Sequence, residues 1–173
     1  LLKVGLRREA LDELAALQEK FKNDPLSLYQ LALVYREQGL YGLSMACAQR
    51  LVRLSPAESV YQVPSYLQKL AFPIYFSDVV LAEAEEFGLD PLLLFALIRQ
   101  ESAFEPKATS WADARGLAQV MPGTGEWIAL KLGWPDFQVD DLYKPYLNIK
   151  FGTWYLAQQL EFFGGDPFAA LAA

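Results

Sequence analysis

The residue with the clearest potential for chemistry is Glu101, a glutamate near the end of an otherwise apolar helical segment. That segment, residues 91–102, begins with a proline, as helices commonly do. At about 100° per residue, Glu101 projects to the same side as Leu94 and Leu97, and Arg99 projects to the opposite side. Burial in a cleft raises the pKa of a carboxyl group, as a general acid near neutral pH requires. The same position also fits a helix that leaves the core there, with Glu101 meeting water at its end.

The composition restricts acid-base chemistry to carboxylates, tyrosine and lysine. The sequence has no histidine, which excludes Ser-His-Asp and Cys-His catalysis and every histidine-based metal site. Its single cysteine, Cys47, lies among small apolar residues, and we expect it to be buried and structural.

The charge and the apolar runs limit the partners. A net charge of −6 argues against nucleic acid, because phosphate binding depends on clustered lysine and arginine. No apolar run reaches the roughly 18 residues that a transmembrane segment needs; the longest, residues 92–98, has the length of a core helix. The sequence given shows no signal-peptide pattern, which carries no information about segments outside it.

Apolar residues recur at helical spacing along nearly the whole chain, which predicts an all-α fold with at most a minor sheet. Residues 10–21 are expected to form a short amphipathic helix, and Asp24 before Pro25 predicts the cap of the next one. Residues 28–56 follow the spacing of a tetratricopeptide-type (TPR-like) helix pair, although an unrelated helical hairpin also fits. Because one such pair leaves a face unburied, we expect the end of a longer helical array or a brace for a second domain.

Prolines at positions 56 and 64 interrupt the helical pattern and predict two domains. We expect a helical-repeat segment at 1–64 and a second domain at 65–173. In the second domain, Ser77 and Asp78 predict the cap of a helix that ends at Gly88, and Asp90 predicts the cap of the following helix. Aromatic residues are dense there; they suit stacking on sugars, but aromatic stripes at helical spacing more often form a core. The aromatic pair Trp154 and Tyr155 is assigned to packing.

Several stretches of the second domain resemble the soluble lytic transglycosylases of bacterial peptidoglycan. The resemblance covers roughly the last three fifths of the chain. It rests on residues 88–91, 96–104, 110, 114–124, 148–149 and 152–156. It implies a lysozyme-like α domain beside a superhelix of helix pairs, which agrees with the repeat-like N-terminal part.

The activity implied by the resemblance is cleavage of the β-1,4 bond between N-acetylmuramic acid and N-acetylglucosamine without water. The product carries a 1,6-anhydromuramoyl end. Glu101 would be the sole acid and base, whereas ordinary glycosidases need two carboxylates about 5 to 10 Å apart. The resemblance implies no metal and no cofactor. It implies peptidoglycan glycan strands as substrate, a periplasmic or envelope location, and cell-wall proteins as potential partners of the N-terminal helices.

The resemblance also assigns four supporting residues. Ser110 and Gln119 match positions near the reacting sugar, Met121 matches a position that lines the cleft, and Ser102 stands beside the acid. From residue type alone, Ser110 equally fits a turn cap, and Ser102 fits a hydrogen bond to its own helix.

The sequence departs from the family pattern at several positions. Ala118 replaces the usual methionine, which predicts a roomier cleft wall, and Trp111 and Asp113 stand where proline and a small residue are usual. Asp113 is a candidate second carboxylate, although aspartate in a loop is more often a turn former. We assign Asn148 a structural role as a helix cap. In the family a Tyr-Asn-Ala-Gly motif follows a segment like residues 169–173, so we expect the sequence to be a fragment.

Two other functions fit the same residues. One is a lysozyme-like hydrolase, in which water attacks the sugar. The other is a noncatalytic peptidoglycan-binding or scaffold module.

Overall fold

The computed structural model describes residues 6–172, and every regular element in that range is an α-helix or a 3₁₀ turn, which confirms the all-α prediction. The only β-type pairing among the described residues is two isolated antiparallel bridges, between Thr109 and Arg115 and between Arg115 and Val120. The elements, in chain order, are α1 (Arg7–Lys20), α2 (Pro25–Glu37), α3 (Tyr41–Leu54), the 3₁₀ turn η2 (Val60–Gln62), α4 (Ser65–Ala71), α5 (Ser77–Phe87), α6 (Pro91–Ser102), α7 (Pro122–Lys131), the 3₁₀ turn η3 (Val139–Tyr143), α8 (Pro145–Phe162) and α9 (Pro167–Ala172).

The chain divides into two compact units, Leu1–Pro73 and Ile74–Ala173. Because the division follows α4, that helix belongs to the first unit. Within the described range, no helix combines the length and the apolar character needed to cross a bilayer.

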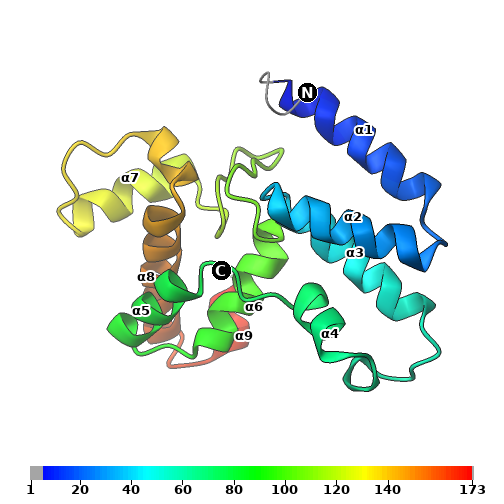
Figure 1. The fold of residues 1–173 in the computed structure, drawn as a ribbon. Helices are drawn as coiled ribbons and strands as arrows, with labels where there is room; N and C mark the ends of the chain where they lie inside the picture. Colours follow the sequence, from blue (N-terminus) through cyan, green and yellow to red (C-terminus); the bar gives the residue numbers. More distant parts are fainter. Residues whose placement is uncertain (1–5, 173) are drawn as a thin grey trace. The chain divides into compact units, whose positions relative to one another are not determined.

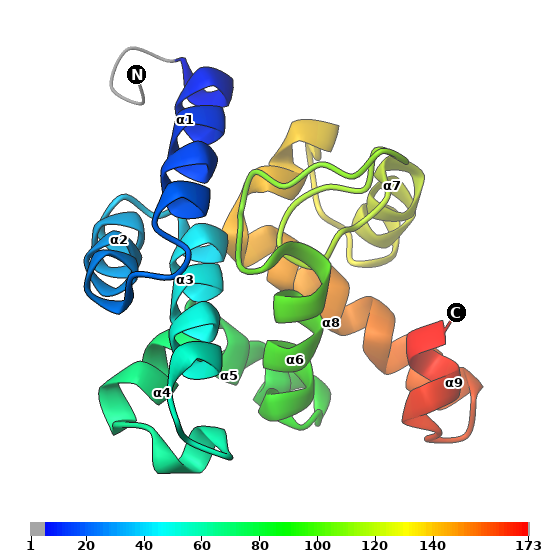
Figure 2. The ribbon, with the colours of Figure 1, turned by 90° about the vertical axis from the view of Figure 1, so that its right-hand side faces the viewer.

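The first unit is built on α2 and α3, which lie side by side (Figures 1 and 2). As predicted, Asp24 caps α2: its carboxylate accepts a hydrogen bond from the backbone N–H of Leu26 at 3.2 Å. The hydroxyl of Ser44 on α3 donates to the carbonyl of Ala32 on α2 at 2.7 Å, deep in the contact. Cys47 is fully buried, which raises the pKa of its thiol to about 11 and fits a structural role. The helix pair is present, and its kinship with tetratricopeptide repeats stays a prediction.

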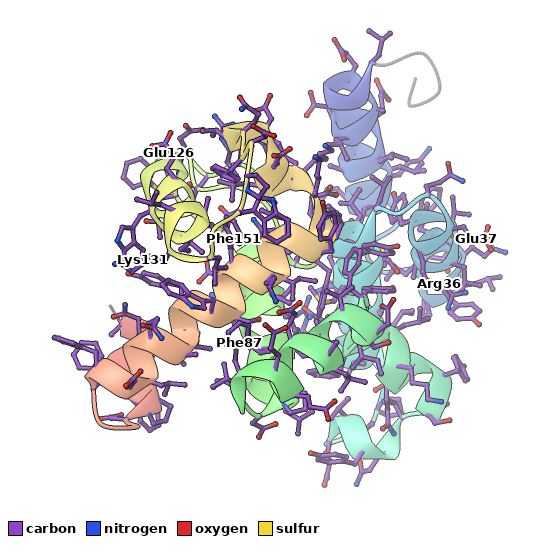
Figure 3. All side chains as sticks on the ribbon, turned by 90° about the vertical axis from the view of Figure 1, so that its left-hand side faces the viewer. Arg36, Glu37, Phe87, Glu126, Lys131 and Phe151 are labelled. Carbon is purple, nitrogen blue, oxygen red and sulfur yellow. The ribbon has the colours of Figure 1, made fainter. Side chains whose placement is uncertain are left out.

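The second unit is arranged around α8, against which α5, α7, α9 and η3 pack. Phe151 of α8 is fully buried between α8 and α7, where it joins Ile128 in one apolar cluster (Figure 3). On another side of α8, Lys150 pairs with Glu83 and Glu86 of α5. α8 therefore connects the elements that carry the candidate site.

The helix starts of the second unit were predicted with mixed success. Asp90 caps α6 as expected, because its carboxylate accepts a hydrogen bond from the N–H of Leu92 at 2.8 Å. The prediction that Ser77 and Asp78 cap α5 was wrong: Phe76 occupies the cap position in a left-handed conformation, and no side chain caps the helix. α5 does end at Gly88, whose φ of 66° is the left-handed conformation that glycine readily adopts.

Candidate active site

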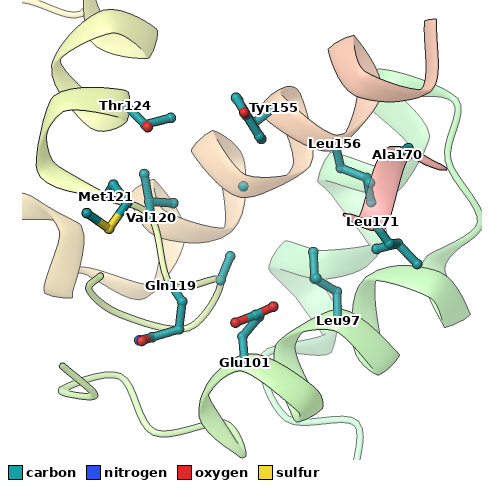
Figure 4. A pocket seen from close by; sticks show the side chains of 12 residues that line it. Leu97, Glu101, Gln119, Val120, Met121, Thr124, Tyr155, Leu156, Ala170 and Leu171 are labelled. Carbon is teal, nitrogen blue, oxygen red and sulfur yellow. The ribbon is translucent and has the colours of Figure 1, made fainter. Parts of the chain in front are cut away.

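Glu101 stands in the last turn of α6 and lines a cavity of about 370 Å³, within the range of small-molecule sites. Its carboxylate points into the space between Gln119 and Leu97 (Figure 4). The helical projection grouped Glu101 with Leu97, and both line this cavity. The lining consists of Leu97, Glu101, Ala118, Gln119, Val120, Met121, Thr124, Gly152, Tyr155, Leu156, Ala170 and Leu171.

The environment of Glu101 combines access with partial desolvation. The side chain is exposed, so an incoming ligand can reach it. Partial burial of the carboxyl nevertheless raises its pKa above the ordinary value, because the charged form loses hydration. Glu101 is thus a reachable carboxyl group with an increased tendency to carry a proton.

The backbone turns sharply after Glu101. Ala103 and Phe104 have φ values of 50° and 63°, a left-handed conformation that is unusual for a bulky residue. Phe104 is fully buried, and its ring packs edge-on against Tyr75 at a centroid distance of 5.6 Å. The hydroxyl of Ser102 donates to the carbonyl of Ile98 at 3.1 Å, and Ser102 does not line the cavity.

The loop after α6 returns to the cavity and brings Gln119 and Met121 to it. Gln119 has a left-handed φ of 49°, and its side-chain NH₂ donates to the carbonyl of Gly116 at 2.8 Å. Its side-chain oxygen accepts no hydrogen bond from the described residues and is available to a ligand. Met121 is 43% exposed, so its thioether offers an apolar surface at the cavity.

Ser110 lies in a turn and not in the cavity lining. Its hydroxyl accepts hydrogen bonds from the N–H groups of Ala112 at 3.2 Å and Ala114 at 3.0 Å, the turn-cap arrangement. Asp113 also lies outside the lining, and both of its carboxylate oxygens accept from Arg115, at 3.1 and 3.2 Å. The structure therefore does not bring the candidate second carboxylate to Glu101.

Asn148 is not the helix cap that we expected. It lies inside α8, fully buried. Its amide oxygen accepts from the N–H of Ala118 at 2.7 Å, and its NH₂ donates to the carbonyls of Arg115 and Leu142, each at 2.8 Å. The residue is structural, but it connects α8 to the loop that lines the cavity.

The sequence analysis gave no site role to seven lining residues: Val120, Thr124, Gly152, Tyr155, Leu156, Ala170 and Leu171. The packing predicted for Trp154 and Tyr155 is confirmed, because both rings pack against the apolar cluster that contains Phe151, and Trp154 also meets Trp127 edge-on at 5.2 Å. Tyr155 lines the cavity as well. Consecutive helical residues point about 100° apart, which agrees with Tyr155 reaching the cavity where Trp154 does not. Among the described residues, no group of three or more His, Cys, Asp or Glu side chains could hold a metal ion.

The family model for the transglycosylase SLT domain matches residues 78–173. The chain belongs to this family. The matched range starts in α5 and includes every residue that lines the cavity, so the cavity and its glutamate are part of the SLT domain.

Two curated relatives of the SLT domain show the extent of the similarity. The chain is 38% identical over 101 residues to the membrane-bound lytic murein transglycosylase C of Edwardsiella ictaluri, covering 57% of this chain and 28% of that protein. It is 34% identical over 103 residues to the soluble lytic murein transglycosylase of Salmonella typhimurium, covering 59% of this chain and 16% of that protein. The chain thus spans a minor part of each relative's length.

Solved structures extend the likeness over most of the chain. An inactive glutamate-to-glutamine mutant of the lytic transglycosylase Slt from Pseudomonas aeruginosa gives a TM-score of 0.76 at 25% identity, covering 95% of this chain and 25% of that one. The 70 kDa soluble lytic transglycosylase from Escherichia coli gives a TM-score of 0.66 at 24% identity, covering 86% and 22%. The expected lysozyme-like all-α fold is confirmed by these neighbours.

Proposed function

We propose that the chain is part of a peptidoglycan lytic transglycosylase of the bacterial envelope, with a catalytic domain in the second unit and a helical-repeat segment in the first unit. The observation that carries this proposal is that Glu101 is the only carboxylate among the described residues lining the cavity. The names of the curated relatives support murein as the substrate class. The inactive glutamate-to-glutamine mutant of the Pseudomonas aeruginosa enzyme supports dependence on one glutamate.

In the proposed reaction, protonated Glu101 donates its proton to the glycosidic oxygen, and the bond from that oxygen to C1 of N-acetylmuramic acid breaks. The carboxylate left on Glu101 then accepts the proton of the C6 hydroxyl while the C6 oxygen bonds to C1. The product is a 1,6-anhydromuramoyl end, and Glu101 returns to its protonated form without consuming water. The raised pKa of Glu101 favours the first step.

A single carboxylate suffices for this reaction for two physical reasons. The 2-acetamido oxygen of the substrate can stabilise the cationic C1, which removes the need for a protein nucleophile. The C6 hydroxyl belongs to the same sugar, so its effective concentration at C1 is far above that of an external nucleophile.

The supporting residues divide into two groups in this proposal. Gln119 and Met121 contact the sugar, because both line the cavity with Glu101. Ser102 fixes the backbone at the end of α6 and Ser110 fixes a turn within the loop that follows, since their hydroxyls bond to nearby main-chain groups. Tyr155 joins the first group, as a lining residue whose ring can stack on a sugar.

Product analysis tests the reaction type. Digestion of purified peptidoglycan in ¹⁸O-labelled water is expected to release muropeptides with anhydro ends and no label at C1. Label at C1 would identify a lysozyme-like hydrolase instead. Binding of glycan strands without turnover would identify a noncatalytic module.

A substitution tests the role of Glu101. Glu101→Gln is expected to keep the fold and glycan binding but to lower turnover at least about a hundredfold, the usual scale for losing a general acid. Glu126→Gln, at an exposed glutamate of α7 outside the lining, is the matched control and is expected to retain activity. Near-parental turnover by Glu101→Gln would remove Glu101 from the mechanism.

A further inference from the structure

Asn148 is a buried polar side chain whose hydrogen bonds go to backbone groups outside its own helix. Its three bonds, to Ala118, Arg115 and Leu142, use both ends of the amide. A buried amide costs folding free energy unless its polar atoms are paired, and a leucine in its place would leave the backbone N–H of Ala118 and the carbonyl of Leu142 without this amide as a partner. The arrangement therefore points to a role for the bonds themselves.

The segment that Asn148 holds is a small hairpin, residues 115–120. Its ends are joined by two backbone hydrogen bonds of 3.0 Å between Arg115 and Val120. Asn148 inserts its amide against this hairpin, and Gly116 provides the space: a Cβ there would lie 2.4 Å from the amide nitrogen of Asn148 and 2.2 Å from the carbonyl oxygen of Leu142. The amide of Asn148 therefore fits only because residue 116 has no side chain.

The hairpin carries two residues that line the cavity beside Glu101. One is Ala118, whose N–H is held directly by Asn148. The next is Gln119, whose left-handed backbone persists in a non-glycine residue only where the surroundings hold it. The position of this cavity wall therefore depends on a contact made from α8.

We propose that Asn148 is a positioning residue, which fixes the 115–120 hairpin to α8 and thereby sets where Ala118 and Gln119 stand relative to Glu101 during the reaction. This inference rests on the proposed function and adds a residue that touches neither the substrate nor the reacting atoms. Misplacement by about 1 Å at a reacting centre costs roughly a hundredfold in rate, so a backbone anchor has a measurable effect on turnover.

Asn148→Asp tests the proposal in the whole 173-residue chain. It keeps an oxygen for the N–H of Ala118 but places a second oxygen against the carbonyls of Arg115 and Leu142. We expect kcat on peptidoglycan to fall roughly ten- to a hundredfold with a smaller change in KM. We also expect the titration of the Glu101 carboxyl, followed by NMR, to shift because the wall beside it moves.

Ser44→Ala is the matched control. It removes a buried side-chain-to-backbone hydrogen bond of 2.7 Å in the first unit, far in sequence from the cavity residues. Both variants are expected to lower Tm, whereas only Asn148→Asp should change kcat and the Glu101 titration. In a Gln119→Ala background, the effect of Asn148→Asp on kcat should shrink, because the two substitutions act on the same wall.

Parental kcat and a parental Glu101 titration in folded Asn148→Asp would overturn the proposal. If that variant does not fold, Gly116→Ala disturbs the same contact from the hairpin, because its Cβ would overlap the Asn148 amide. It is measured by kcat and by the Glu101 titration. If the parental chain shows no turnover, the proposed function fails. The Glu101 titration and the side-chain amide resonances of Gln119 then still decide whether Asn148 positions the wall.

Discussion

Ala118 and Gly152 are in direct contact, so close that a Cβ at position 152 would lie 2.4 Å from the Cβ of Ala118. Both residues line the cavity that contains Glu101. Because Gly152 has no side chain, the 115–120 hairpin packs directly on the backbone of α8. One helix therefore supplies part of the cavity lining and also supports the wall beside it.

This contact predicts an unusual outcome for Gly152→Ala. Replacing a glycine inside a helix by alanine ordinarily stabilises a protein by about 0.5 to 1 kcal/mol. Here the added methyl group overlaps Ala118, and we expect a loss of about 1 to 3 kcal/mol in the free energy of unfolding, measured with urea. Gly123→Ala in α7 is the control, because a Cβ there meets nothing within 4 Å. Equal stabilisation by both substitutions would refute the contact.

The raised pKa of Glu101 predicts how stability depends on pH. Because burial disfavours the ionised carboxyl, its pKa is higher in the folded than in the unfolded state. The stability that the parental chain gains from keeping Glu101 protonated is fully present below the pKa of Glu101 in the unfolded state, about 4.3. It is lost as pH rises through the higher pKa of Glu101 in the folded state. Glu101→Gln should therefore gain Tm relative to the parental chain as pH rises from about 4 to 8. A difference in Tm that stays constant over this range would contradict the assignment.

Asp113→Asn separates the single-carboxylate reaction from a two-carboxylate one. Asp113 has a left-handed φ of 68°, which asparagine also tolerates, so the turn is expected to survive. Its carboxylate is bound by Arg115 and does not line the cavity. We expect turnover within a few-fold of the parental value, far from the hundredfold loss expected for Glu101→Gln. A comparable loss in both variants would instead indicate that Asp113 takes part in the reaction.

Local chemistry was the most predictable part of the fold. Asp24 and Asp90 cap their helices as expected, because a cap depends on a side chain and an N–H two residues away. The start of α5 was mispredicted because Phe76 adopts a left-handed conformation that no short pattern announces. Such a conformation is set by surrounding structure and not by residue type.

The candidate site shows the same limit. Glu101, Gln119 and Met121 line one cavity, while their roles in binding and catalysis stay predictions. Asn148 was misassigned because its partner Ala118 lies 30 residues away, and hydrogen bonds over such separations leave no periodic signal in the sequence. Burial of an uncharged polar residue within an apolar helix would have been the only hint.

Lys150 joins α8 to α5, and we expect its ion pairs to stabilise that contact. Its ammonium group lies 3.1 Å from Glu83 and 2.7 Å from Glu86, and 5.3 Å from the centroid of the Phe87 ring at the end of α5. Burial raises the pKa of Glu83 despite the lysine. For Lys150, burial alone would lower the pKa, but the hydrogen bonds to Glu86 and Glu83 hold it above its ordinary value.

Lys150→Met keeps the apolar stem but leaves the Glu83 carboxylate, whose side chain is only 14% exposed, without its cation. We expect a loss of roughly 1 to 3 kcal/mol in the free energy of unfolding at pH 7. The loss should shrink as pH falls through the raised pKa of Glu83, because a protonated carboxyl needs no cation. It should also shrink in a Glu83→Gln background, which a double-mutant cycle in urea measures. If the loss is equal at pH 7 and at a pH below the raised pKa of Glu83, and equal in the parental and Glu83→Gln backgrounds, Lys150 stabilises α8 through its aliphatic packing alone.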